Sequence, residues 1–461
     1  MPKNAAIALE SAADAARGWR DAHTESTGQD AMDIDEFFSR HGFSAAPDAE
    51  ALLSGFDAQM DAGLAARPSS LAMLPAYLDV SRDVPAETPV VVLDAGGTNL
   101  RVAVVWFDKA GKARIEDFHK YKMPGTGGAP LGAAEFYDTF AGFLEPVCRR
   151  AESVGFCFSY PTEIFPDLDG RLLRWTKQID APEVVGTRVG SGVSEALRAK
   201  TGRSLHVKVL NDTTATLLAG KTAGVTRRYS SYVGFILGTG TNTAYIEKNG
   251  RIAKVPGLDP AGSMIVNVES GGFDGAPRSD FDRAACASLK GGDEGLFEKM
   301  ISGAYLGAVG RELLKAAARE GFFSAPAAEA LLRLDDLPTM DFDNAVDNPF
   351  IGTGALSAVP MTDDDRRALV ALGEPLFLRA AAFTAANVSA AVLRSGAGRD
   401  PLHPVCVTID GSTYYKTRSA MFKSRVEQGL RDILGPRGVH FDCLFVDDAP
   451  MIGSAVAGLI A

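Results

Sequence analysis

Acidic and amide side chains stand directly beside glycine-rich turns at several points of this chain. The clearest case is Asp94-Ala95-Gly96-Gly97-Thr98-Asn99, which separates two apolar runs within residues 90–106. This pattern is typical of two buried strands joined by a tight turn. Glycines let the backbone approach a ligand closely, and the hydroxyl and amide groups add donors. A carboxylate beside a loop that cradles phosphate needs a cation between them, so Asp94 implies Mg²⁺.

The same pattern returns further along the chain. A strand predicted at Tyr232–Leu237 leads into Gly238-Thr239-Gly240-Thr241-Asn242, and an exit strand follows at Thr243–Glu247. A third glycine turn, Asp410-Gly411-Ser412, follows the strand predicted at Cys406–Ile409. Two strand–turn–strand units in one chain indicate a pair of related lobes, each of which offers one phosphate loop to a shared cleft.

Further polar side chains follow predicted strands or apolar runs. Asn211 and Asp212 stand between a strand and a helix, where they either cap the helix or project from the strand end at which open α/β sheets bind ligands. Glu269 and Glu298 are further candidates, as is Thr176-Lys177, for which a solvated surface lysine is the alternative. These side chains suit a small ligand with many hydroxyl groups. Phosphoryl transfer to it needs positioning, Mg²⁺ and one base, and an ionised aspartate can serve.

The elements around these residues have the pattern of an α/β protein. Strands predicted at Ala113–Tyr121 and Val154–Tyr160 enclose an amphipathic helix over Ala133–Ala151, the order of a sheet covered by helices. Residues 1–85 carry apolar positions at helical spacing, which predicts two or three helices packed against a larger domain.

The C-terminal half is predicted to be mostly helical. Gly295–Arg319 is expected to form one long helix, and Leu369–Leu393 a buried one. Phe445–Asp448 is expected to close the sheet, before a helix of small residues at Met451–Ile460. Residues 322–366 carry no clear pattern.

Composition excludes several classes of protein. The chain has 461 residues, of which 46% are hydrophobic and 23% charged, as in a globular protein of several domain-sized units. A net charge of −11 argues against nucleic acid or an anionic membrane as the main partner. The five scattered cysteines favour free thiols over disulfides or zinc. Without a signal-like core or an apolar stretch of membrane length, we expect a cytoplasmic protein.

Several of these motifs together resemble the hexokinase/glucokinase family. The run F-E-K-M-I-S-G-A-Y-L-G at 297–307 is the most specific, whereas the glycine loops are shared by the wider actin-like ATPase superfamily. The resemblance spans about residues 85 to 461. The other matching pieces, in family order, are F-S-Y-P at 158–161, W-T-K at 175–177, N-D-T at 211–213, N-V-E-S-G-G-F at 267–273 and D-G-S at 410–412.

The resemblance implies a single-unit, eukaryotic-type hexokinase with two actin-like (ribonuclease H-like) α/β lobes and a cleft between them. The small lobe would comprise residues 86–211 plus about 447–461, and the large lobe residues 1–85 plus 212–446. The cofactors would be ATP and Mg²⁺, and the partners a hexose and Mg-ATP, without nucleic acid or membrane. A monomer or a homodimer is expected.

The family's functional residues transfer onto matching positions of this chain. Asp212 would be the general base for the 6-hydroxyl of glucose, or also of mannose or fructose, and Lys177 would stabilise the transferring charge. Residues expected to bind the sugar are Ser159, Thr176, Lys177, Asn211, Asp212, Asn242, Glu269 and Glu298. Those expected to bind the nucleotide are Asp94, Gly96, Gly97, Thr98, Asn99, Gly238, Thr239, Gly240, Gly411 and Ser412, with Asp94 reaching Mg²⁺ through water.

Two departures from the family pattern keep alternatives open. Ser270 stands where the family usually has Trp, which allows a kinase of another hexose or amino sugar. Ala449-Pro450-Met451-Ile452-Gly453 replaces a Gly-Ser-Gly-Lys-Gly segment, so nucleotide preference is left open. A catalytically weak sugar-sensing protein is the alternative from another class, although the intact Asp212 and Lys177 speak against it.

Overall fold

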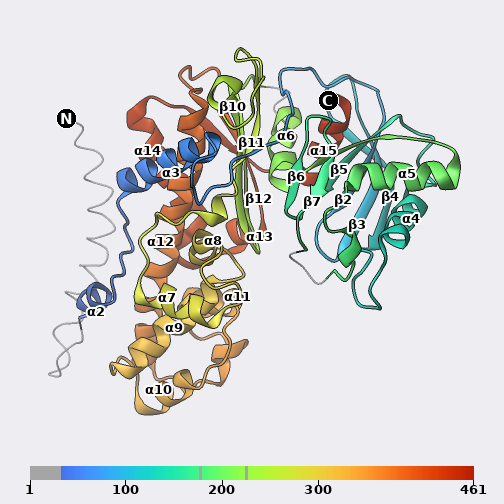
Figure 1. The fold of residues 1–461 in the computed structure, drawn as a ribbon. Helices are drawn as coiled ribbons and strands as arrows, with labels where there is room; N and C mark the ends of the chain where they lie inside the picture. Colours follow the sequence, from blue (N-terminus) through green and yellow to red (C-terminus); the bar gives the residue numbers. More distant parts are fainter. Residues whose placement is uncertain (1–32, 176–178, 224–226, 461) are drawn as a thin grey trace.

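Two β-sheets, each flanked by helices, make up the protein (Figure 1). The computed structural model describes residues 33–175, 179–223 and 227–460. The small sheet has five strands in the order β4-β3-β2-β5-β8, and the large sheet has six in the order β1-β11-β10-β9-β12-β13. The mixed α/β architecture with two sheet-containing lobes confirms the fold class expected from the sequence. The lobe boundaries stay a prediction.

The small sheet is built around the predicted strand–turn–strand unit. Its strands are β2 (Val90–Ala95), β3 (Asn99–Phe107), β4 (Ala113–Lys122), β5 (Ser153–Phe158) and β8 (His206–Leu210). Side chains of β2 alternate between its two faces, as the strand period requires. Val91 packs with α4 (Ala133–Leu144) and α5 (Val189–Thr201), and Val92 packs with α15 (Ala449–Ile460) on the other side (Figure 1). The strands β6 (Thr162–Ile164) and β7 (Gly170–Leu172) form a separate hairpin.

The large sheet combines antiparallel and parallel pairing. Its strands are β1 (Leu74–Pro75), β9 (Ser231–Leu237), β10 (Thr241–Lys248), β11 (Ser263–Asn267), β12 (Val405–Asp410) and β13 (Phe441–Leu444). β9 and β10 form the second predicted hairpin. β12 runs parallel to β9 with Asp410 opposite Ile236, so the turns that follow these two strands lie side by side.

Most helices belong to the same lobe as the large sheet. They are α2 (Ile34–Arg40), α3 (Ala49–Leu64), α7 (Asp280–Ser288), α8 (Leu296–Ile301), α9 (Leu306–Arg319), α10 (Ala325–Leu332), α11 (Thr339–Asp347), α12 (Asp363–Ser395), α13 (Ser412–Lys416) and α14 (Phe422–Leu434). Of these, α12 packs directly on β9 and β10, and several of the others pack on one another. Among the described residues α12 alone is long and apolar enough to cross a membrane, but 83% of its apolar window is buried inside the protein. It therefore has the burial of a core helix.

Three predicted elements differ in the structure. The helix expected over Ala133–Ala151 ends at Leu144 as α4, since Pro146 has no N–H with which to continue it. The helix expected over Gly295–Arg319 is broken between α8 and α9, because backbone N–H groups of the break bond to another loop, as described below. The last strand is Phe441–Leu444 and not Phe445–Asp448, since Phe441 pairs with Val405 of β12 and Phe445 is 56% exposed.

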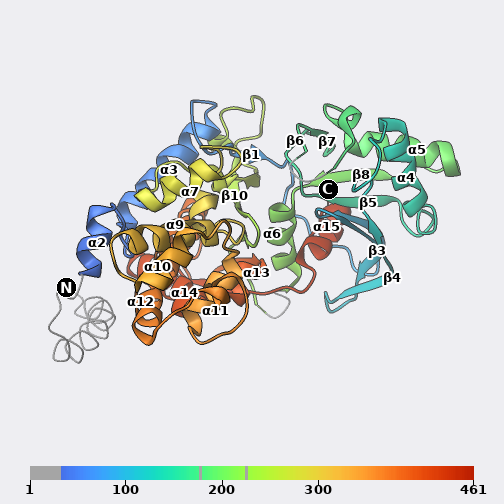
Figure 2. The ribbon, with the colours of Figure 1, turned by 90° about the horizontal axis from the view of Figure 1, so that it is seen from below.

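The helix α6 (Asp212–Ala223) joins the two sheets. It lies beside α15 in both views, between the small and large sheets (Figure 2). A side chain at Gly453 of α15 would place its Cβ 1.7 Å from the carbonyl oxygen of Ala215 of α6, so glycine alone permits this approach. The N-terminus of α6, which carries Asp212, is thereby fixed relative to both sheets.

Candidate active site

The first loop, residues 94–99, presents its polar groups to the outside. Gly96, Thr98 and Asn99 are exposed, whereas Gly97 is buried with φ 97°. The hydroxyl of Tyr160 donates to the carbonyl oxygen of Gly97 at 2.9 Å, and the N–H of Met123 donates to that of Thr98 at 2.9 Å. Buried hydrogen bonds thus fix the backbone of this loop, while its exposed residues can contact a ligand.

A buried ion pair lies directly under the first loop. Asp94 is 2% exposed, and its Oδ2 lies 2.6 Å from Nη2 of Arg101 on the opposite strand. The other guanidinium nitrogen of Arg101 contacts Asp448 at 2.9 Å. Burial raises the pKa of the Asp94 carboxyl and the charge of Arg101 opposes that rise. Without its cation, Asp94 would be an uncompensated buried charge.

The donor set at this point is compatible with Mg²⁺ held largely by other oxygens. Oδ2 of Asp94 has no aligned hydrogen bond in spite of its contact with Arg101. Among the described residues, no group of three or more His, Cys, Asp or Glu side chains could enclose a metal. Mg²⁺ usually keeps several waters and binds one or two carboxylates together with phosphate oxygens, so a single buried carboxylate suffices.

The second loop, residues 238–242, is packed against two other segments. The N–H groups of Gly303 and Ala304 donate to the carbonyl oxygens of Gly238 and Thr239 at 2.8 and 3.1 Å. These bonds explain why the helix breaks between α8 and α9. Oγ1 of Thr413 also donates to Gly238 at 2.7 Å. The most family-specific run of the sequence, residues 297–307, thus supports a loop from the adjoining strand pair.

The third loop, residues 410–412, lies against the second. Gly411 has φ 115°, and a Cβ there would lie 2.3 Å from the carbonyl oxygen of Leu237. Only glycine fits both the dihedral angle and the space. Ser412 is exposed at the start of α13, and Asp410 accepts the N–H of Gly411 at 2.7 Å. The two loops form one continuous edge.

The sequence left open whether Asn211 and Asp212 cap the helix or face a ligand, and in the structure each residue suits one of these roles. Oδ1 of Asn211 accepts the N–H of Thr213 at 2.8 Å and so caps α6. Asp212 is half-buried and, among the described residues, accepts only a longer bond, 3.3 Å, from Oγ1 of Thr213. Its carboxylate therefore stays available for another proton donor.

Asp212 lies at the electrostatic centre of the site. Burial raises the pKa values of Asp94, Asp410 and Glu269, and the negative charge of Asp212 adds to each rise. The charge of Arg101 opposes the shift at Asp410. Groups from both sheets thus act on one another across a shared space that includes Asp212.

Glu269 is held by amide side chains. Nδ2 of Asn267 donates to its Oε1 at 2.7 Å, and Nδ2 of Asn242 donates to the same oxygen at 3.2 Å. Asn242 also donates to Oδ1 of Asn267 at 2.7 Å. Burial raises the pKa of Glu269, the amide of Asn267 lowers it, and Asp212 and Glu298 add to the rise. Among the described residues, Oε2 of Glu269 has no donor and can accept one from a ligand.

Glu298 and Ser159 complete the described part of the predicted set. Oε2 of Glu298 accepts the N–H of Thr241 at 2.9 Å, and burial raises its pKa. A Cβ at Gly240 would lie 2.5 Å from that oxygen, so Gly240 makes room for the carboxylate. Ser159 follows β5, where its N–H donates to Ala95 at 3.2 Å beside the first loop.

A small cavity lies between Asn211 and Glu269, two of the predicted site residues. Its volume is about 20 Å³, enough for one water and far too small for a sugar. It is lined by residues of the β6 hairpin region, of the α6 start and of the Glu269 segment: Leu74, Pro75, Ala76, Tyr160, Thr162, Ile164, Asn211, Thr214, Asn267 and Glu269. The cavity therefore marks where the two sides of the site meet.

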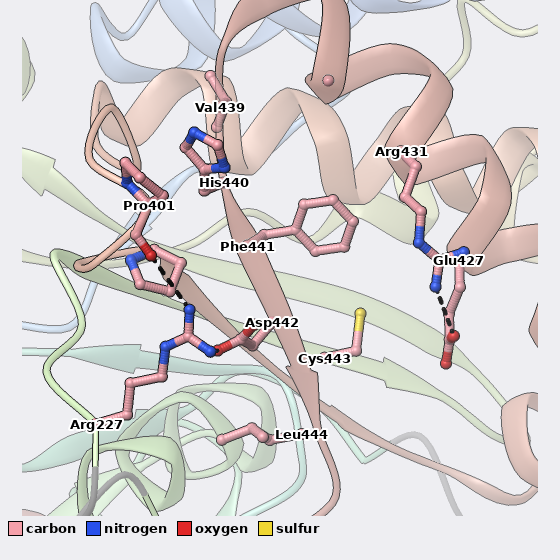
Figure 3. Close-up of a pocket in the computed structure, with 12 residues that line it drawn as sticks. Arg227, Pro401, Glu427, Arg431, Val439, His440, Phe441, Asp442, Cys443 and Leu444 are labelled. Atoms are coloured by element: carbon pink, nitrogen blue, oxygen red, sulfur yellow. Dashed lines mark hydrogen bonds and ion pairs between the residues drawn. The ribbon is translucent and has the colours of Figure 1, made fainter.

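A larger cavity of about 780 Å³ lies elsewhere, along the edge strand β13 (Figure 3). Arg227 pairs with Asp442 at 2.9 Å, and Arg431 pairs with Glu427 at 3.3 Å (Figure 3). No residue predicted for the site lines this cavity. Size alone therefore does not identify the site here.

The sequence-predicted residues come together, with two exceptions. Thr176 and Lys177 lie outside the described residues. Three participants were missed: Arg101, Asn267 and Asp410. Counting residues across the first hairpin would have paired Arg101 with Asp94, which are cross-strand partners. Asn267 and Asp410 stood inside the matching motifs but were not assigned a role.

Comparison with known proteins gives a consistent result. Two family models described as hexokinase match residues 39–222 and 232–460. Hexokinase-1 of Spinacia oleracea is 30% identical over 409 residues, which cover 82% of this chain and 80% of that protein. Hexokinase-1 of Schizosaccharomyces pombe is 29% identical over 430 residues, or 88% of this chain and 86% of that one. The structure of hexokinase from Schistosoma mansoni complexed with glucose matches with a TM-score of 0.73 at 25% identity, over 92% of this chain and 98% of that one. The chain belongs to the hexokinase family.

Proposed function

We propose that this chain is an ATP-dependent hexokinase that transfers the γ-phosphoryl group to the 6-hydroxyl of glucose, and of mannose and fructose, as the first step of glycolysis. The observation that carries the proposal is the placement of Asp212. Asn211 caps the helix, so the carboxylate of Asp212 does not have to. The charge of Asp212 also raises the pKa values of Asp94 and Glu269, which belong to the two different sheets. The relative complexed with glucose supports the choice of sugar.

On the sugar side, the polar groups serve as directional hydrogen-bond partners. Glu269 and Glu298 accept donors from sugar hydroxyls, and the amide of Asn211 can both donate and accept. The amide of Asn242, whose oxygen and NH₂ group are already bonded to protein groups, would hold Glu269 in place beside the sugar. Asp212 accepts the proton of the attacking hydroxyl as the new bond to phosphorus forms. Because water is a competing nucleophile, closure of the lobes over the sugar should complete the site only when the sugar fills it.

On the nucleotide side, the three loops offer backbone donors to the phosphates. The proposed contacts are Gly96–Asn99 of the first loop, Gly238–Gly240 of the second and Gly411–Ser412 of the third. Asp94 would face Mg²⁺ through water, and the bound ion would supply charge neutralisation of the phosphate oxygens. Lys177 is assigned the stabilisation of the transferring charge. We place the protein in the cytoplasm, in keeping with five free cysteines, four of them buried.

The test is a coupled assay of ADP release with Mg-ATP and a panel of hexoses, run on wild type and on Asp212→Asn. We expect the variant to lose about 10³-fold or more in kcat while it still binds glucose, because the amide keeps the shape but takes no proton. Asp138→Asn, an exposed carboxylate paired with Lys200, is the matched control and should retain wild-type rates.

Other results would redirect the assignment. Glucose binding without phosphate transfer by wild type would make the chain a sugar sensor. Transfer to another hexose or to an amino sugar alone would place the substrate difference at Ser270, the residue that departs from the family pattern. Equal activity of Asp212→Asn and wild type would remove Asp212 as the base.

A further inference from the structure

A closed ring of hydrogen bonds lies buried directly behind the sugar-binding residues. Its members are Thr243 near the start of β10, Ser270 after β11 and Asn387 in the C-terminal third of α12, with exposures of 1%, 0% and 2%. Oγ1 of Thr243 donates to Oδ1 of Asn387 at 3.1 Å, and Nδ2 of Asn387 donates to Oγ of Ser270 at 3.3 Å. The two hydroxyl oxygens lie 3.1 Å apart.

The donors in this polar ring can be assigned. Thr243 gives its proton to Asn387, so the proton between the two hydroxyls comes from Ser270. Each hydroxyl then donates once and accepts once, and the amide of Asn387 does both. Hydrogen bonds in a closed, fully satisfied network strengthen one another in a low-dielectric interior. A side chain that lacks either the donor or the acceptor of Asn387 would leave buried hydroxyl groups unmatched.

The polar ring is connected to the site through the backbone of its own members. The N–H of Thr243 donates to Oδ1 of Asn242 at 2.7 Å, and the N–H of Ser270 donates to the same oxygen at 3.3 Å. With Oδ1 occupied by two peptide donors, the NH₂ group of Asn242 must point toward Asn267 and Glu269. The orientation of the Asn242 amide thus depends on the relative position of Thr243 in β10 and Ser270 after β11, which the polar ring joins.

Glu269 depends on the same anchor. It precedes Ser270 and adopts φ 59° and ψ 48°, a left-handed conformation that side-chain-bearing residues rarely hold. Such a conformation persists only where surrounding contacts enforce it. The polar ring fixes the residue after Glu269, and the amides of Asn267 and Asn242 fix its carboxylate.

We propose that Asn387, although it lies in the core helix α12, is a positioning residue that sets the sugar-binding geometry of Asn242 and Glu269. The inference deepens the proposed function and rests on it. It also accounts for Ser270, where the family pattern has Trp: the amide of Asn387 lies against its hydroxyl, and a side chain with no exposed surface leaves no room for an indole.

The test uses Asn387→Leu, which keeps the approximate size but can neither donate nor accept. We expect the KM for glucose to rise about tenfold, while the KM for Mg-ATP stays within about twofold, since the proposed nucleotide contacts of the second loop, Gly238–Gly240, share no hydrogen bond with the described members of the polar ring. Equilibrium binding of glucose, followed by calorimetry, should weaken by the same factor. Ser389→Ala, a change two residues further along α12 at a buried hydroxyl that has no hydrogen-bond partner within the described part of the chain, is the matched control.

A triple variant, Thr243→Val with Ser270→Ala and Asn387→Leu, separates positioning from stability. An apolar replacement of every member leaves no unmatched polar group, so the melting temperature should return toward wild type. We expect the KM for glucose to stay high in the triple variant, because the side-chain hydrogen bonds that set the relative position of the two strand ends beside Asn242 are still missing. Recovery of both properties together would assign Asn387 a structural role only and overturn the proposal.

Failure of the proposed function can be told apart from failure of this inference. If wild type binds glucose but transfers no phosphate, the binding measurements on Asn387→Leu and the triple variant still decide the question. Unchanged glucose affinity in Asn387→Leu, or an equal rise of both KM values, would overturn the positioning role while leaving the kinase assignment intact. If wild type binds no hexose, the proposed function and this inference fall together.

Discussion

The two strand–turn–strand units have the same topology but differ in charge and in how their loops are packed. In the first, a buried carboxylate and its cation, Asp94 and Arg101, lie under a loop whose polar face is open. In the second, the residues before the turn are apolar, and the loop is packed against Gly303 and Thr413. In the proposed function the first unit would therefore supply charge to the nucleotide, and the second would supply rigid placement. A repeated motif need not have a repeated role.

Two buried acids of the site differ in their partners. Asp94, in the first unit, faces Arg101, whereas the described groups that act most on the pKa of Glu269 are two amides and two further carboxylates, Asp212 and Glu298. Burial raises both pKa values, and among the described residues a cation opposes the rise only at Asp94. A neutral amide at either place should therefore relieve a buried charge at pH 7, but the gain in stability should be smaller at Asp94, where Arg101 loses a partner.

The largest effect is expected from Arg101→Met. Removal of the cation leaves Asp94 buried and unpaired, which should lower the free energy of unfolding by about 3 kcal/mol in urea titrations. The pKa of Asp94 should rise further, so the acid limb of the pH profile for kcat/KM with Mg-ATP should move to higher pH. Arg114→Met, which breaks a half-exposed pair with Asp108, is the control and should cost about 0.5 kcal/mol or less. Equal losses in the two variants would contradict the distinction.

Gly411→Ala should have the next largest effect. The added Cβ would collide with the carbonyl of Leu237 at a φ of 115°, so we expect a loss of about 2 kcal/mol, measured by urea unfolding. Gly96→Ala in the first loop meets no atom nearer than Oδ1 of Asp94 at 3.8 Å. It should leave stability within about 0.5 kcal/mol and instead raise the KM for Mg-ATP. If Gly96→Ala proved the more destabilising, the loops would not differ as described.

The smallest effect, and one of opposite sign, is expected from Glu269→Gln. Because the folded-state pKa of Glu269 is raised above its ordinary value of 4.5, the contribution of this residue to stability is fully present below that pH and is lost as the pH rises through the raised pKa. Gln keeps the acceptor for both amides and carries no charge. It should stabilise the protein by about 1 kcal/mol at pH 7, and the gain should vanish near pH 4, while glucose phosphorylation is lost.

Melting curves of Glu269→Gln and wild type between pH 4 and pH 8 check this sign. Asp94→Asn is the counterpart: it removes a buried charge but leaves Arg101 with Asp448 alone, so it should stabilise less than Glu269→Gln at pH 7. A gain in Asp94→Asn as large as that in Glu269→Gln, or a Glu269→Gln gain that does not depend on pH, would show that the cation does not separate the two acids.

Local pattern was sufficient for features that depend on a few neighbouring residues. The alternation of apolar residues around Asp94–Asn99 predicted a hairpin, and its register follows from the turn. The break between α8 and α9 could not be predicted in the same way, because the helical pattern continues through it and the cause is a set of hydrogen bonds to Gly238 and Thr239. Asn387 was missed for a related reason: a single amide in an Ala-rich helix has no meaning until Thr243 and Ser270 are placed against it.

The close packing of α15 on α6 and β5 has a consequence for synthesis. Val90 and Val92 of β2 share a core with Ala455 and Val456 of α15, which follows the whole large sheet in chain order. Domains generally fold as units from the N-terminus as the chain emerges from the ribosome. Here one apolar face of the small sheet stays uncovered until α15 has been synthesised. The small sheet should therefore complete its folding after the large sheet has been synthesised, and its exposed apolar face should bind chaperones until then.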